Sequence, residues 1–213
     1  NVARTHPADL KPYSDIRFEP SIASVQEKNT LIQQAVDRVA SLASDHSDIH
    51  LSSQQRDALK AFVQSRLQLT LNPSRDVWMD MAHAYVPAEQ MSDMANKAIA
   101  YDWSVVEHVW RNARISVKDI AVRILRIQNR DALLAQFGPS MSRNPLRPPY
   151  PPAPADATIV EIVVPMMIRE SRSESQRRVY VGYSCWWDDS GQRWVPRNTS
   201  VYSDHGSLVA PPQ

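Results

Sequence analysis

Glycine is scarce in this chain, with four residues among 213 and none before Gly138. Loops that cradle phosphate groups need several closely spaced glycines, because a Cβ atom would keep the backbone away from the ligand. The chain contains neither a G-x-G-x-x-G motif nor a Walker-type loop. These absences exclude nucleotide binding through either device.

Cysteine occurs once, at Cys185, so the chain cannot form an internal disulfide. A lone cysteine fits the cytosol and also an exported protein whose core provides its stability. No apolar run of about 18 residues occurs, so the sequence predicts no transmembrane segment. Because the chain begins at Asn1, we expect a processed or trimmed form. The resulting hypothesis is a periplasmic, secreted or envelope-associated protein, with a cytoplasmic location as the alternative.

A large excess of charge of either sign is also missing, since the net charge is +1. The whole chain therefore has no general attraction to nucleic acid or to acidic membranes, and polyanion binding would require a local patch. Apolar residues make up 43% and charged residues 22%, which is typical of a globular protein. The length suits one medium domain or two small ones.

Helical patterns dominate the first two thirds of the chain. After an expected extended arm at residues 1–23, the stretches Ser24–Glu27 and Ser52–Gln55 match capping boxes, and apolar residues follow each at spacings of three and four. Similar patterns continue to Gly138, which sits where a helix C-terminal glycine belongs. We therefore predict a helical region over residues 24–138, with one helix running from near Ser116 to about residue 137.

The composition changes at residues 139–156, where proline occupies every third position from Pro145 to Pro154. We interpret this segment as a stiff linker rather than as a ligand for an aromatic groove. Residues 157–203 contain alternating apolar runs and a tight-turn signal, and residues 204–213 form a tail. The predicted fold class is α+β, with a mostly helical N-terminal two thirds, a Pro-rich linker and a small antiparallel β-sheet of three strands.

The densest group of possible metal ligands lies in the stretch SDHSDIH and comprises Asp45, His46, Asp48 and His50. Capping signals place helices on both sides of it, and no second His and Asp cluster completes a coordination sphere. Asp and Ser also favour turns through their own side-chain hydrogen bonds. We therefore predict a helix–helix connection without metal, and a metal site is the alternative.

Two other patterns bear on catalysis. Gly182–Trp186 partly matches the G-x-S-x-G elbow of hydrolases, but Trp186 replaces the second glycine and Ser184 falls inside a predicted strand. Glu107 and His108 are helix neighbours that point about 100° apart. We predict no catalytic residues, no metal and no cofactor, while an active site built from dispersed residues stays an open alternative.

Basic residues concentrate between residues 111 and 130. On a helix, the apolar residues of this stretch share one face and the basic residues spread over the opposite side. Such a side can bind phosphate groups, so nucleic-acid or polyanion binding is the alternative function. Its candidate residues are Arg111, Arg114, Lys118, Arg123, Arg126 and Arg130.

Aromatic residues gather near the C-terminal end, where three of the six tryptophans lie between residues 186 and 194. Because neighbouring strand residues point to opposite faces, Trp187 is predicted to face the core and Trp186 a more exposed face. Exposed aromatic rings mark contact surfaces. The leading hypothesis is a non-enzymatic protein–protein interaction or scaffold module, with another protein as its partner. Its candidate partner-binding residues are Tyr180, Trp186 and Trp194.

Overall fold

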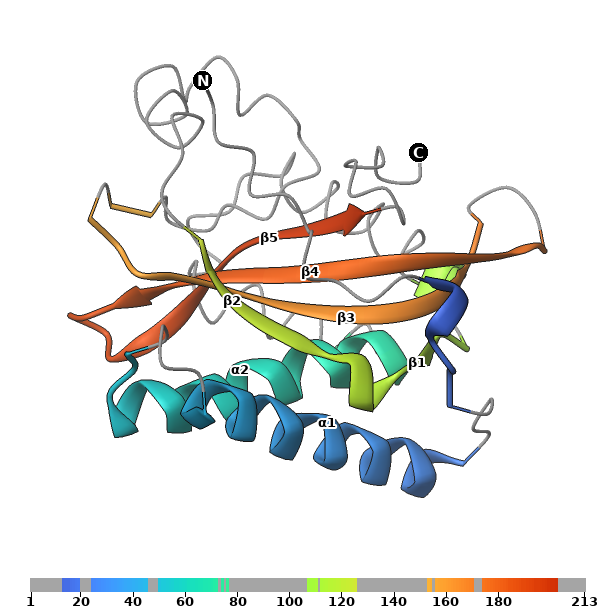
Figure 1. Cartoon of the computed structure of the whole chain (residues 1–213), viewed down its shortest axis with the longest axis horizontal. Helices are drawn as coiled ribbons and strands as arrows, with labels where there is room; N and C mark the ends of the chain where they lie inside the picture. Colours follow the sequence, from blue (N-terminus) through green and yellow to red (C-terminus); the bar gives the residue numbers. More distant parts are fainter. Residues whose placement is uncertain are drawn as a thin grey trace, which may run out of the picture.

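Two helices cover one face of an antiparallel β-sheet in the computed structural model of the chain (Figure 1). The structure describes residues 13–19, 24–45, 50–72, 74, 76, 107–110, 112–125, 153–154, 156–170 and 174–202. The helices are α1 (Val25–Asp45) and α2 (Ser53–Leu71), with short 3-10 helices η1 (Tyr13–Asp15) and η3 (Val117–Asp119). The strands are β1 (Arg114–Ile115), β2 (Ala121–Leu125), β3 (Ile159–Arg169), β4 (Gln176–Asp188) and β5 (Arg193–Tyr202).

Both long helices begin at capping boxes, as the sequence predicts. The Ser52 side chain accepts a hydrogen bond from the backbone N–H of Gln55, and the Gln55 side chain accepts one from the backbone N–H of Ser52. Ser24 and Glu27 make the same reciprocal contacts before α1. These bonds satisfy donors that the first helical turn leaves unpaired. The two starts therefore fix where each helix begins.

The prediction of a mostly helical first two thirds is wrong. The helix expected from near Ser116 does not form, because residues 114–125 build β1, η3 and β2 and pair with β3. Apolar residues four apart, such as Ile120 and Ile124, fit a helix but also fit a strand of period two. Val122 is buried in the same core as Ile120, two residues away, which is the pattern of a strand. Expected helical residues at 77–106 and 126–137 lie outside the described part.

The antiparallel sheet is present, and the described residues contribute five strands to it rather than three. β1 and β2 both pair with β3, and β4 and β5 follow on its other side. Pro165 of β3 explains why its neighbour is divided into two strands. Its carbonyl accepts a hydrogen bond from the Ser116 backbone N–H, and proline has no N–H to return one. The chain leaves the ladder there and forms η3 before β2 begins.

The main core lies between the sheet and the helices. Residues of one parity in β3 and β4, among them Ile162 and Tyr183, face apolar residues of α1 and α2 such as Val39 and Leu67. The second face of the sheet is buried as well, because Val163, Tyr180 and Trp186 are all less than 10% exposed. None of the described helices has the length and apolar character needed to cross a bilayer.

The described part of the expected N-terminal arm contributes to this second face. Ile16 packs with Val163 and Tyr180, and Phe18 packs against the same cluster. The guanidinium group of Arg178 lies over the Phe18 ring, 5.8 Å from its centroid. Residues 13–19 therefore form part of the folded body.

Candidate interaction site

The ligand-rich stretch between α1 and α2 is a helix–helix connection, as predicted. Asp45 is the last residue of α1, and His50 is an exposed residue shortly before Ser52 caps α2. His46 and Asp48 lie outside the described residues. Within the described part of the chain, no three His, Cys, Asp or Glu residues are grouped as metal ligands. The absence of metal from this connection therefore stays a prediction.

Trp186 and Trp187 point to opposite faces of β4, as strand alternation predicts. Trp187 belongs to the main core beneath the helices, and Trp186 packs with Ile159 and Val195 on the second face. The predicted difference in exposure is wrong, because each tryptophan is 7% exposed. The prediction assumed that one face of the sheet meets solvent, whereas Trp186 and Trp187 are buried on opposite faces.

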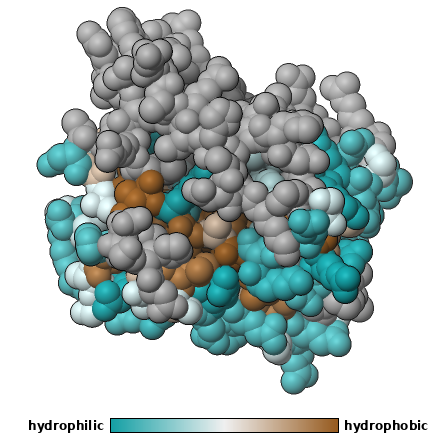
Figure 2. All heavy atoms as spheres, viewed as in Figure 1, coloured by the Kyte–Doolittle hydropathy of each residue, from teal (hydrophilic) through white to brown (hydrophobic). Residues whose placement is uncertain are grey.

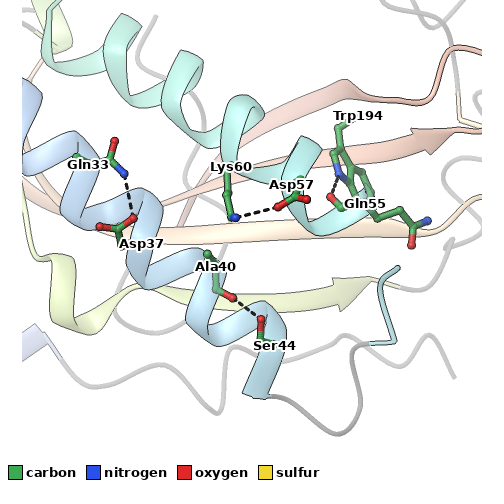
Figure 3. A network of polar contacts seen from close by, with 8 residues as sticks. All are labelled: Gln33, Asp37, Ala40, Ser44, Gln55, Asp57, Lys60 and Trp194. Atoms are coloured by element: carbon green, nitrogen blue, oxygen red, sulfur yellow. Dashed lines mark hydrogen bonds and ion pairs between the residues drawn. The ribbon is translucent and has the colours of Figure 1, made fainter. Parts of the chain in front are cut away.

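The other two aromatic candidates are also buried. Tyr180 packs with Ile16 on the second face, and Trp194 lies in the main core. The indole Nε1 of Trp194 donates a 2.8 Å hydrogen bond to the Gln55 carbonyl in the first turn of α2 (Figure 3). A role of Tyr180, Trp186 and Trp194 in partner binding stays a prediction, but in the folded chain these rings pack internally.

The basic residues do not form the helical stripe that the sequence suggested. Arg114 lies on β1 and donates a 2.8 Å hydrogen bond from Nε to the Glu19 carbonyl. Lys118 is exposed on η3, and Arg123 lies on β2. Arg111, Arg126 and Arg130 lie outside the described residues.

A buried ion pair occupies the second face of the sheet. Glu161 on β3 is 1% exposed, and its Oε2 accepts a 2.6 Å hydrogen bond from Nε of Arg123 on β2. The same oxygen lies 2.6 Å from Nη2 of Arg123 in an ion pair. The hydroxyl of Tyr202 on β5 donates a 2.7 Å hydrogen bond to Oε1 of Glu161. The guanidinium carbon of Arg123 also lies 5.4 Å from the centroid of the Tyr202 ring, within cation–π range. One carboxylate therefore links β2 to β5.

Tyr202 and Gly182 adapt the site to the charged Glu161 side chain. Burial, followed by the Glu161 charge, raises the pKa of Tyr202 to about 12, so the phenol remains a neutral donor at pH 7. Gly182 on β4 leaves room for the carboxylate, because a Cβ atom there would collide with the Glu161 side chain and the Tyr202 ring. The sequence reading missed this cluster. Its available signal was the single charged residue in the apolar run TIVEIVVPMMI.

β2 forms a border of the described sheet. It pairs with β3, and no described residue hydrogen-bonds to the backbone on its outer side. Edge strands usually carry charges, prolines or bulges that prevent pairing with another chain. β2 contains no proline, and its one charged side chain, Arg123, is held against Glu161. Among the described residues, therefore, none pairs with the outer edge of β2.

Apolar side chains gather on the face of the molecule that β2 crosses (Figures 1 and 2). Ile124 of β2 is 37% exposed and Val25 of α1 is 63% exposed. These two are the exposed large apolar residues in the described part of the chain. At β2, an exposed apolar side chain thus coincides with a backbone edge that no described residue pairs with.

Possible catalytic groups in the described sheet are enclosed. Ser184 lies inside β4, as predicted, and is buried. Burial raises the pKa of the Cys185 thiol well above its usual value, which keeps the sulfur in its unreactive neutral form. The Tyr183 hydroxyl is hydrogen-bonded to Thr70 Oγ1 at 2.7 Å, and burial raises the pKa of Tyr183 to about 12. The bond between Tyr183 and Thr70 joins β4 to α2.

Comparisons with models of protein families, with curated proteins and with solved structures found no match to this chain.

Proposed function

We propose that this protein is a non-enzymatic interaction module that binds a partner strand along the outer edge of β2. One observation carries the proposal: no described residue pairs with the outer edge of β2, and the charge of Arg123 on this strand is neutralised by Glu161. In strand addition, main-chain hydrogen bonds provide affinity, and alternate side chains provide specificity. The exposed Ile124 supplies an apolar contact beside those bonds.

The ion pair supports the proposal because it holds the Arg123 side chain against Glu161 rather than in solvent beside the edge of β2. A lysine or arginine that extends into solvent would oppose pairing with another chain. Arg123 instead lies over Tyr202 and against Glu161. β2 therefore combines an apolar strand with a satisfied charge, which favours pairing.

Site-specific photocrosslinking tests this function. A photoreactive amino acid would replace Ile124, and the matched control would place it at Val25, the more exposed apolar residue. In cells that naturally produce the protein, we expect a discrete adduct from position 124 that the control does not give. Mass spectrometry would identify the cross-linked chain. No adduct at position 124, or the same adducts from both positions, would contradict the proposal.

The polyanion-binding alternative depends on a helix over residues 111–130. The helix that motivated polyanion binding is not formed by residues 114–125, and two of its arginines have partners within the protein. No observation now favours that alternative function. The exported or envelope setting stays a prediction from the sequence.

A further inference from the structure

We propose that the strand that binds β2 is β2 of a second copy of this chain, so that two sheets join into one continuous sheet. The inference rests on the proposed function and identifies the partner at the same edge. Its basis is the self-complementarity of β2, whose sequence is Ala-Val-Arg-Ile-Leu. A two-fold interface requires one patch that complements itself.

The register follows from placing the two-fold axis at Arg123, the middle residue of β2. In antiparallel pairing about this axis, Val122 of one copy stands opposite Ile124 of the other, and the reverse pair forms at the same time. Both are β-branched apolar residues that face the helix-covered side of the sheet, since Val122 pairs with Ile162 and Ile124 pairs with Val160. Cross-strand pairs of this kind stabilise sheets. Ile124 would then lose its exposure to water.

Placing Arg123 on the two-fold axis brings two positive charges together, and the ion pair of each Arg123 with Glu161 offsets their repulsion. Two arginines directly opposite each other would normally repel. Each Arg123 is hydrogen-bonded and ion-paired with its own Glu161, so each half of the interface is locally neutral. The guanidinium group also lies over the Tyr202 ring rather than along the strand edge. An unrelated partner strand would not need this balance at the central residue of β2.

The neighbouring helix enlarges the proposed interface. α1 lies against β2 and η3 on the helix-covered side of the sheet (Figure 1). When two sheets join edge to edge, the α1 helices of the two copies come to flank the new strand pair. Their contact is needed because five paired residues per copy bury less surface than the roughly 1,000 Å² expected of a stable interface.

Sedimentation equilibrium of the full chain over a wide concentration range tests this inference. We expect a reversible monomer–dimer equilibrium. Ile124→Lys should weaken the dimer by at least about tenfold, which corresponds to 1.4 kcal/mol, because it places a charge opposite Val122 of the other copy. Lys60→Ala changes an exposed residue of α2, the helix that packs against β5 rather than β2, and should leave the equilibrium unchanged.

Ile124→Thr provides a second variant that keeps the β-branched shape and should weaken the dimer less than lysine does. Circular dichroism would establish that the variants fold. A monomer at all concentrations, or dimers of Ile124→Lys as tight as those of the unaltered chain, would overturn the inference. If the chain is monomeric but photocrosslinking at position 124 captures a different protein, the second-copy inference fails and the proposed function stands.

Discussion

Replacing Arg123 with methionine is expected to lower the free energy of unfolding by about 3–5 kcal/mol, because it leaves the Glu161 charge buried without its partner. The carboxylate is 1% exposed, accepts a hydrogen bond from Nε of Arg123 and forms an ion pair with its Nη2. Tyr202 would remain as a donor to Oε1, but a neutral phenol does not balance the charge. Urea unfolding followed by circular dichroism measures the change.

The double variant Arg123→Met with Glu161→Gln separates loss of charge balance from loss of packing. Removing both charges should recover part of the stability, because no uncompensated ion is then buried. Arg178→Met is the matched control, since Arg178 is an exposed arginine that also lies over an aromatic ring, and its loss should cost about 1 kcal/mol or less. If the single and double variants are equally destabilised, the ion pair does not act as described.

Trp194→Ala is expected to lower the free energy of unfolding by about 3–5 kcal/mol, the usual cost of truncating a large buried aromatic residue. Trp194 is 2% exposed, and its ring meets that of Trp187 edge-on with centroids 5.2 Å apart. Its Nε1 bond to Gln55 joins β5 to the start of α2 (Figure 3). Thermal and urea unfolding would measure the loss.

Lys60→Ala on α2 is the control for this experiment. Lys60 forms an exposed ion pair with Asp57 at 2.8 Å, so its removal should change the free energy of unfolding little. Trp194→Phe should be less damaging than Trp194→Ala, because it keeps an aromatic ring against Trp187 and loses the hydrogen bond. Equal stability of Trp194→Ala and Lys60→Ala would show that Trp194 does not hold α2 to the sheet.

Helix starts and tight turns could be predicted from the sequence, because each depends on hydrogen bonds between residues a few positions apart. The capping serines Ser24 and Ser52 indicated where α1 and α2 begin, because each bonds to a residue three positions later. The turn signal Asp188–Gly191 indicated the β4–β5 hairpin, where Asp188 accepts hydrogen bonds from the backbone and hydroxyl of Ser190. These bonds lower the pKa of Asp188, with the Ser190 hydroxyl as the largest cause.

The strand at residues 121–125, the burial of Trp186 and the partners of Glu161 could not be predicted, because each depends on contacts between residues far apart in the sequence. Residues 121–125 are compatible with either a helix or a strand until β3 pairs with them. The exposure of Trp186 was misjudged because burial of the second sheet face depends on segments distant in the sequence. Glu161 could have been flagged as a charge within an apolar run, but its partners Arg123 and Tyr202 lie on other strands. The candidate edge depends on these pairings and therefore could not be read from local patterns.

Residue-resolved amide hydrogen exchange of β2 in dilute, monomeric protein tests the open edge most directly. In an edge strand, amides that face the neighbouring strand are protected and the alternate amides point outward. The structure predicts that, across residues 121–125, amides bonded to β3 exchange slowly and the others exchange rapidly. Slow exchange at every amide of residues 121–125 in the monomer would show that the outer edge is already paired, and would contradict the proposed binding of a partner strand there.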